Sequence, residues 1–195
     1  MKFILIVLSA GFLIATAEGT AYADDPPFGS LCNENPYAPG TNVAPCFADD
    51  ANMDYCTPST YPAAYGNIFV AAMANLDSQT QMYDTYQPTC GTQTDIGGYL
   101  NTSPEVNLTG TAIRGIALCT KPLGGWGSTR CDQGSLVINT SLVSGTQARK
   151  TLCHEIGHFT GLYHYSGTSY SCMVSGSSTT ITYSPSEVSL INAKY

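Results

Sequence analysis

Three histidines, His154, His158 and His164, are the only histidines in this chain of 195 residues. His154 and His158 are four residues apart, so on a helix their side chains share one face, roughly 5–6 Å apart at Cβ. That separation lets two imidazoles bind one metal ion at about 2.0–2.1 Å each. Glu155 projects about 100° around the helix from His154. We therefore expect it to act as a general base toward a metal-bound water rather than as a ligand.

A catalytic zinc site needs a third protein ligand and an open position. Gly161 accepts the left-handed backbone that most residues resist, so the helix can end there and the chain can swing away. His164 is then the predicted third ligand of a single catalytic Zn²⁺. In the alternative scheme Glu187, the only carboxylate residue after Glu155, is the third ligand. Glu187 also stands three residues after Ser184, the spacing of a helix capping box.

The segment from His154 to His164 reads HEIGHFTGLYH. It resembles the HExxHxxGxxH signature of the metzincin clan of zinc endopeptidases at every fixed position. The sequence around Met173, CMVS, is similar to the Met-turn that lies beneath the metal in that clan. Ser175 departs from the tyrosine that astacin-like and serralysin-like members carry there. Tyr183 is a nearby tyrosine, which we interpret as a packed aromatic residue, and no family within the clan is assigned.

The resemblance implies an α+β fold whose N-terminal subdomain is α/β-like. This subdomain would hold a twisted, mostly parallel sheet, a backing helix and the active-site helix. A smaller C-terminal subdomain would hold the Met-turn and a final helix. Gly161 and Met173 would support the site structurally. The motifs span about twenty residues, and the order of predicted elements extends the likeness over most of the chain from Ala63.

Apolar spacing and capping residues predict the elements that must position this site. The expected helices cover residues 63–81, residues 145–160 (with Ser144 and Gln147 as a capping box) and residues 185–193 (with Ser184 and Glu187 as a second box). Short apolar runs at residues 113–118 and 136–138 predict strands.

The first part of the chain divides into two segments by composition. Residues 1–23 combine Lys2, an apolar stretch and Ala21-Tyr22-Ala23, which is typical of a secretory signal peptide. Residues 24–62 are rich in Pro, Asn, Asp and Cys, which predicts an irregular, disulfide-tied segment. This segment belongs either to the mature fold or to a short inhibitory pro-segment. Residues 63–195 are the predicted catalytic domain.

All eight cysteines follow the predicted cleavage site. An even number of cysteines in an exported chain predicts four disulfides. The sequence contains no CxxC pair, and this argues against a metal site made of cysteines. Spacing does not determine the connectivity, but Cys119 and Cys131 are the pair we expect to form a local bridge. Bridges at Cys153 and Cys172 would brace the proposed site, whatever their partners.

The net charge is −7, with only seven Lys and Arg residues. Nucleic acids and anionic membranes are bound through clustered basic residues, so neither is an expected partner. We predict a secreted, monomeric zinc endopeptidase that hydrolyses protein or peptide substrates through a zinc-bound water activated by Glu155. The alternative is a secreted zinc-containing binding protein or toxin without significant proteolysis. The presence of Glu155 argues against it, because a structural zinc site needs no base.

Overall fold

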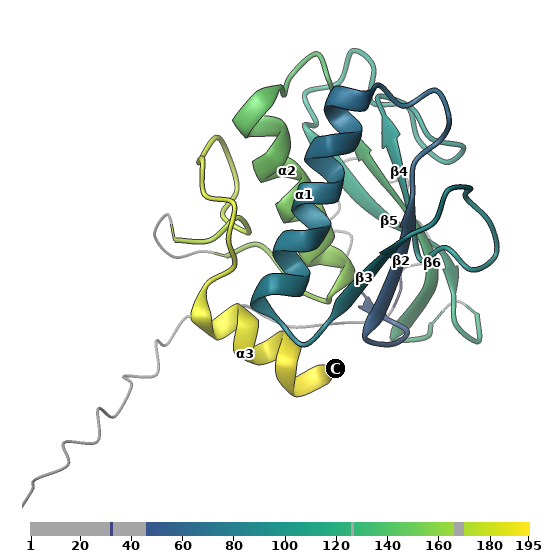
Figure 1. Cartoon of the computed structure of the whole chain (residues 1–195), viewed down its shortest axis with the longest axis vertical. Coiled ribbons are helices and arrows are strands. Elements are labelled where there is room, and N and C mark those ends of the chain that lie inside the picture. Colours follow the sequence, from purple (N-terminus) through teal and green to yellow (C-terminus); the bar gives the residue numbers. More distant parts are fainter. Residues whose placement is uncertain (1–31, 33–45, 126, 166–169) are drawn as a thin grey trace, which may run out of the picture.

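The computed structural model describes residue 32 and residues 46–125, 127–165 and 170–195. Within them the chain has a mixed α/β structure, with six strands in one sheet and three helices (Figure 1). The strands are β1 (Phe47–Ala48), β2 (Asn52–Cys56), β3 (Tyr83–Tyr86), β4 (Ile96–Leu100), β5 (Gly115–Pro122) and β6 (Arg130–Ile138). The helices are α1 (Ala63–Gln79), α2 (Gly145–Phe159) and α3 (Pro185–Lys194).

The sheet is mostly parallel, as the resemblance to metzincins implies. Its strand order is β1-β6-β4-β2-β3, and all pairs along this path are parallel. Strand β5 pairs antiparallel with β6, with Gly115 opposite Ile138 and Ala117 opposite Leu136. Helix α1 connects the parallel strands β2 and β3, since such strands need a crossover connection. Among the described strands, β5 is the one that runs antiparallel to its neighbour.

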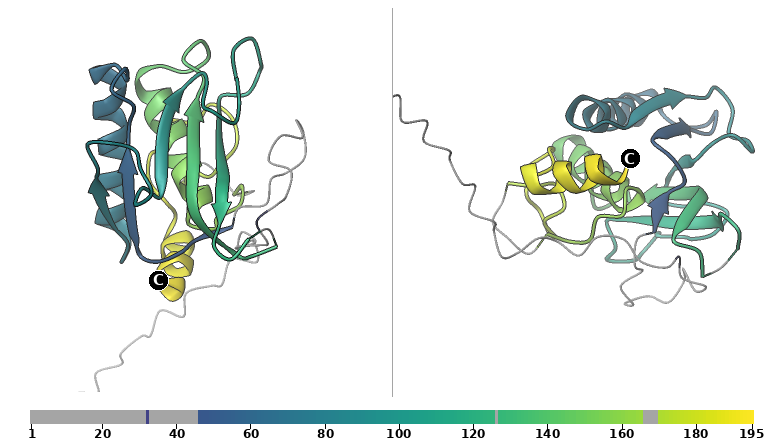
Figure 2. Two further views of the ribbon diagram at one scale, coloured as in Figure 1. Left: turned by 90° about the vertical axis from the view of Figure 1, so that its right-hand side faces the viewer. Right: turned by 90° about the horizontal axis from the view of Figure 1, so that it is seen from below.

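Helices α1 and α2 cover the same face of the sheet, whereas α3 lies at its lower end (Figures 1 and 2). From α1, Phe69 and Met73 point into the core and are 0% exposed. The ring of Phe69 meets the ring of Tyr55 on β2 edge-on, with centroids 5.3 Å apart. Aromatic pairs favour this geometry. The core between helices and sheet thus fixes α2, which carries two of the histidines.

All three predicted helices are confirmed, with ends shifted by a residue or two. The capping box at Ser184 is also confirmed, because its side chain accepts from the Glu187 backbone and the Glu187 side chain accepts in return. The predicted box at Ser144 is wrong. Ser144 occupies the N-cap position of α2 without a side-chain cap hydrogen bond, and Gln147 instead donates to Ser177 O and Ser178 O, both at 3.1 Å.

The expectation of an irregular chain up to Pro62 is wrong for residues 46–56. Strands β1 and β2 form there, and β2 pairs with both β3 and β4 inside the sheet. Met53 and Tyr55 are buried and alternate with the less buried Asn52 and Asp54. Asn and Asp are uncommon in strands, and the alternation covers only these few residues, so the sequence gives a weak strand signal here. Residues 1–31 and 33–45, which include the predicted signal peptide, lie outside the described residues.

All eight cysteines form disulfides, as predicted. The bridges are Cys32–Cys46, Cys56–Cys90, Cys119–Cys131 and Cys153–Cys172. The expected local bridge between Cys119 and Cys131 is therefore confirmed. It joins β5 to β6 and lies against the Cys32–Cys46 bridge.

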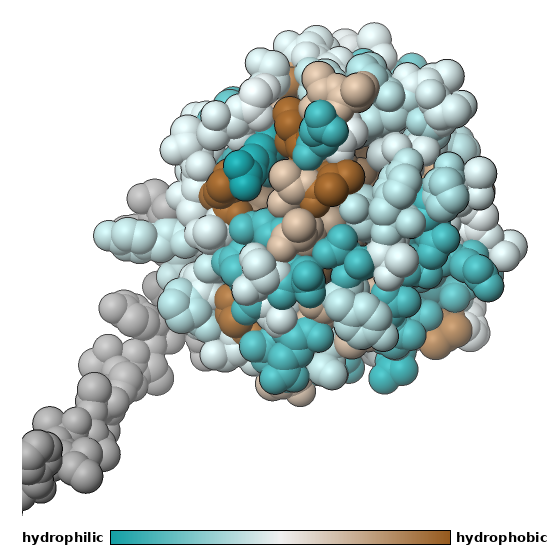
Figure 3. All heavy atoms as spheres, in the orientation of Figure 1, coloured by the Kyte–Doolittle hydropathy of each residue, from teal (hydrophilic) through white to brown (hydrophobic). Residues whose placement is uncertain are grey.

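The surface seen in Figure 3 mixes hydrophobic and hydrophilic residues over the face that α1 crosses. Val70 on α1 is one of the exposed apolar side chains, at 45% exposure. Single exposed apolar residues are normal for a folded chain. Among the described residues, no helix has the length and apolar character needed to cross a membrane.

Asp95, just before β4, makes stability depend on pH. Its Oδ2 accepts a hydrogen bond from the Asp54 backbone N–H at 2.6 Å. Burial, the largest cause, raises the pKa of Asp95 to about 7, and the charges of Asp49 and Asp50 act in the same direction. Between pH ~4 and ~7 the folded chain therefore holds a proton that the unfolded chain has lost. This contribution to stability is complete below pH ~4 and is lost as the pH rises through ~7.

Asp95→Asn should therefore stabilise the protein at pH 8 more than at pH 5. The variant keeps an oxygen acceptor for the Asp54 N–H and removes the charge. We expect the Tm to exceed that of the wild type by about 2–4 °C at pH 8, the shift that about 1 kcal/mol gives in a chain of this size. The expected shift is small because the Asp95 side chain is partly open to solvent, which screens its charge. Thermal unfolding at both pH values checks it, with the exposed Asp77→Asn as control. An equal difference at the two pH values would contradict it.

Candidate metal centre

Helix α2 brings the first two histidines together. His154 and His158 are four residues apart on it, and their ring centroids are 4.7 Å apart. His154 is 7% exposed, whereas His158 is partly exposed. Leu152 and Ile156 on α2 are fully buried and hold this helix against the core. The packing of α2 thus leaves the histidine-bearing side at the edge of the buried region.

The turn after α2 brings the chain back toward His154 and His158. Gly161 adopts a φ of +96°, the left-handed conformation that the sequence predicts for it. The Gly161 N–H donates to His158 O at 3.1 Å and the Leu162 N–H to Gly157 O at 3.0 Å, which closes the end of the helix. The His164 ring centroid then lies 4.9 Å from that of His154 and 5.1 Å from that of His158.

One potential ligand atom from each histidine lies within 4.8 Å of the others. Two of the rings have their orientation fixed by backbone carbonyls. His154 Nδ1 lies 2.8 Å from Cys172 O, and His158 Nδ1 lies 2.6 Å from Leu162 O. A neutral imidazole that donates from Nδ1 keeps its Nε2 lone pair free for a metal ion. The two rings are thereby set in the tautomer that ligation requires.

Burial keeps these imidazoles neutral. It lowers the pKa of His154 to about 2 and that of His158 to about 4, and it also lowers the pKa of His164. Neutral imidazole is the form that binds a metal ion. Three neutral nitrogen donors suit Zn²⁺, which accepts three protein ligands and leaves a position open in catalytic sites. The donor set of this cluster therefore fits zinc.

Glu155 lies beside the cluster and is not part of it. Its side chain faces β5, because a Cβ placed on Gly115 would lie 2.8 Å from Glu155 Oε1. Glu155 is 6% exposed. Burial raises the pKa of Glu155 to about 8, whereas the Lys150 ammonium and a hydrogen bond from the Ala117 backbone act in the opposite direction. The carboxyl group is thus separate from the histidine cluster, and a pKa close to neutral pH suits a group that both accepts and donates a proton.

Met173 packs against α2 at Gly157, which lies between His154 and His158 in the sequence, and it is fully buried. Its Sδ occupies the space where Gly157 would carry a side chain, so this close approach requires glycine. Tyr183 also packs against Gly157, and its hydroxyl donates to Cys153 O at 2.9 Å. Tyr183 is 4% exposed, which agrees with its interpretation as a packed aromatic residue.

The Cys153–Cys172 disulfide ties α2 to the chain that carries Met173. Cys153 immediately precedes His154, and Cys172 immediately precedes Met173. The Cys172 carbonyl is also the partner of His154 Nδ1. This bridge therefore links the backbone next to His154 to the backbone next to Met173.

Glu187 does not join the histidines, which contradicts the alternative ligand scheme. Its Oε2 accepts hydrogen bonds from Ser184 N and Ser171 Oγ, both at 2.6 Å. The carboxylate thus belongs to the capping box of α3. Among the described residues, the other cluster of potential ligand atoms consists of Cys32, Cys46 and Cys119, and all three are oxidised in disulfides.

Lys150 is a buried residue that we did not predict at this site. It is 4% exposed and its Nζ donates to Val174 O at 2.6 Å and to Gly176 O at 3.3 Å. The position four residues before His154 placed it on the same face of α2. A basic residue on the inner face of an amphipathic helix is the sequence feature that could have identified Lys150 as part of this site.

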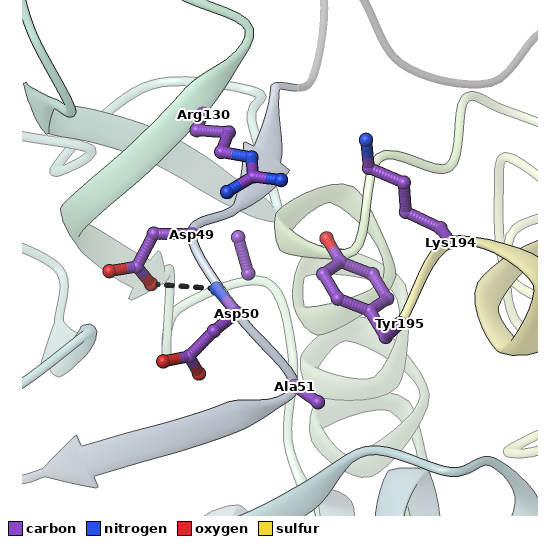
Figure 4. Close-up of a pocket in the computed structure, with 7 residues that line it drawn as sticks. Asp49, Asp50, Ala51, Arg130, Lys194 and Tyr195 are labelled. Atoms are coloured by element: carbon purple, nitrogen blue, oxygen red, sulfur yellow. Dashed lines mark hydrogen bonds between the residues drawn. The ribbon is translucent and has the colours of Figure 1, made fainter.

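A small polar pocket elsewhere is lined partly by Asp49, Asp50, Arg130, Lys194 and Tyr195 (Figure 4). The side chain of Tyr195 extends toward the chain around Asp49 and Asp50, between β1 and β2 (Figure 4). None of the histidines lines this pocket. Its mixed charges and separate residues distinguish it from the metal centre.

No protein-family model matches the sequence, and no curated protein is similar to it in sequence. One similar solved structure is high choriolytic enzyme 1, a hatching enzyme zinc-protease from Oryzias latipes (medaka fish). The identity is 19% and the TM-score is 0.39, over 70% of this chain and 54% of that chain. This chain thus spans about half the length of that structure.

Proposed function

We propose that this chain is a secreted zinc-dependent endopeptidase with a metzincin-like fold. His154, His158 and His164 are the zinc ligands, Glu155 is the general base, and Gly161 and Met173 support the site. The observation that carries the proposal is the convergence of three neutral imidazoles beside a buried carboxylate that is not a ligand. A purely structural zinc site would have no use for such a base.

The chain's own residues divide the chemistry among them. Bound zinc would act as a Lewis acid toward the peptide carbonyl and would lower the pKa of water toward ~7. Glu155 takes a proton from the attacking water on a carboxylate oxygen, and it later delivers that proton to the nitrogen of the leaving amine. Glu155 lies against Gly115 and Ala117 of β5. The carbonyls of Cys172 and Leu162 hold two of the rings in place throughout.

Strand β5 gives the substrate a place to bind. Among the described strands, β5 pairs with β6 alone, so its second edge retains backbone donors and acceptors. An extended peptide can add to such an edge as a further strand. Gly115 and Ala117 of β5 are the residues that approach Glu155, so a peptide on this edge would pass the site. Protein or peptide chains are therefore the proposed substrates.

The remaining parts of the proposal concern the organisation of the chain. Residues 1–23 are a signal peptide removed on export, and the mature protein acts as a monomer. The disulfides fit an oxidising compartment. Strand β2 lies inside the sheet, so we place residues 46–62 with the catalytic domain rather than in a pro-segment.

Removal of the metal tests the function. The full chain, secreted from an oxidising host and loaded with zinc, should cleave members of a diverse peptide library. A zinc chelator should abolish this cleavage and added zinc should restore it, because the ligands without metal supply no Lewis acid. Mass spectrometry of the products locates the cut bonds. A folded, zinc-loaded and processed protein that cleaves no peptide would contradict the proposal.

A further inference from the structure

The chain that follows Met173 runs along one side of α2. We call residues 174–178 the post-Met segment. It begins next to the site, since Val174 forms a β-bridge with Tyr165 and the Tyr165 N–H donates to Met173 O at 3.0 Å. Tyr165 follows His164 directly. The post-Met segment therefore continues from the buried Met173 to the surface beside Tyr165, the residue after His164.

Little in the post-Met segment itself explains why it stays in place. Ser175, Gly176 and Ser177 are exposed, and Val174 is only partly buried. Gly176 has a φ of +93°, and glycine restricts the backbone less than any other residue. The segment thus buries little apolar area of its own, which is the usual source of rigidity.

Two side chains from α2 hold the carbonyls of this segment. Lys150 Nζ donates to Val174 O and Gly176 O, and Gln147 Nε2 donates to Ser177 O and Ser178 O. Gln147 and Lys150 are three residues apart, so they lie on the same face of the helix. Between them they bind four of the five carbonyls of the segment.

Burying the charged side chain of Lys150 at this position costs free energy. Its ammonium is buried, and burial lowers the pKa of Lys150. Placing a charge there costs free energy that hydrogen bonds to carbonyls offset only in part. An apolar side chain of the same length would fill the space at a lower cost. A fixed position for Val174 O and Gly176 O is what the ammonium adds, because charge-assisted hydrogen bonds are short and directional.

We propose that Lys150 is a positioning residue that, together with Gln147, holds the post-Met segment as a preformed wall of the substrate cleft. The inference rests on the proposed function and concerns how the same site receives its substrate. A wall that is already ordered spares the peptide the entropy cost of ordering it on binding. The effect of Lys150 should therefore fall on substrate binding, and the histidines should keep their geometry.

The test compares Lys150→Met with Lys150→Arg. We expect Lys150→Met to raise the KM for a cleaved peptide about tenfold, the lower end of what a hydrogen bond to a charged group contributes, with kcat little changed. Lys150→Arg keeps a donor and should recover part of the loss. The absorption spectrum of the Co²⁺-substituted protein should be the same in all forms. Lys194→Met, a change of an exposed lysine on α3, is the control and should match the wild type.

Hydrogen exchange of residues 172–178 gives a readout that does not depend on activity. It should be faster in Lys150→Met than in the wild type and the control. An active Lys150→Met variant with unchanged KM would overturn the inference, and so would unchanged exchange. Joint loss of kcat and of the Co²⁺ spectrum would also overturn it, because Lys150 would then act on the metal site. A Co²⁺-loaded wild type that cleaves no peptide would instead contradict the proposed function.

Discussion

Glu155→Gln is expected to lower kcat/KM for peptide cleavage by about 10²- to 10⁴-fold, with one zinc ion per chain retained. The amide has nearly the shape of the carboxylate but cannot accept a proton from water. Glu155 lies outside the histidine cluster, so its replacement should not remove a ligand. Burial also raises the pKa of Glu155 to about 8, so a neutral side chain at this position should not destabilise the fold. Kinetics together with metal analysis check this result.

The matched control for this prediction is Glu105→Gln. Glu105 is a partly buried carboxylate that accepts hydrogen bonds from Ser103 Oγ at 2.8 Å and Ser135 Oγ at 2.7 Å. Glu105→Gln should keep most of the activity. If Glu155→Gln lost its zinc, the assignment of Glu155 as a non-ligand would be wrong. If it kept both zinc and full activity, Glu155 would not be the base.

Replacing both Cys153 and Cys172 with serine should weaken zinc binding as well as the fold. The free energy of unfolding should fall by about 2–5 kcal/mol, the usual effect of losing a native disulfide. The zinc affinity should fall about 10- to 100-fold, because the Cys172 carbonyl orients His154 through Nδ1 and such partners of a ligand have effects of this size. Competition with a chelating dye, at a temperature where the variant is folded, measures the affinity.

The Cys119–Cys131 bridge supplies the control for this effect. It closes a loop of similar length, with a sequence separation of 12 compared with 19. It joins β5 to β6, and neither of its cysteines is next to Met173 or to a histidine in the sequence. The double serine variant of this pair should lose stability but keep its zinc affinity. Equal zinc affinities in both double variants and the wild type would show that the Cys153–Cys172 bridge does not position His154.

The histidine cluster could be predicted from the sequence because its parts are local. Two of the histidines share one helix, and the third follows a glycine whose left-handed φ is confirmed. The partners of these residues could not be predicted. Cys172 O lies 18 residues from His154, and Val174 O lies 24 residues from Lys150. Contacts of this kind depend on how distant segments of the chain pack together, so the spacing of residues along the sequence does not predict them.

The fold shows the same division between local and distant information. Helix α1 was predictable because its apolar residues repeat at helical spacing, and α3 because Ser184 and Glu187 form its cap. Strand β2 was missed because it is only five residues long and contains Asn52 and Asp54, residue types that are depleted in strands. Strand β3 was also not predicted. It is short and mostly exposed at the edge of the sheet, so the pairing with β2 rather than its own composition makes it a strand.

The most direct test of the account is X-ray absorption spectroscopy of the zinc-loaded protein. Three imidazole nitrogens and one further light-atom ligand should surround the metal, at about 2.0–2.1 Å and with no sulfur neighbour. This result would establish His154, His158 and His164 as the ligands and leave one position for the substrate or water. A sulfur ligand near 2.3 Å, or fewer than three imidazoles, would contradict the metal centre from which the function is inferred.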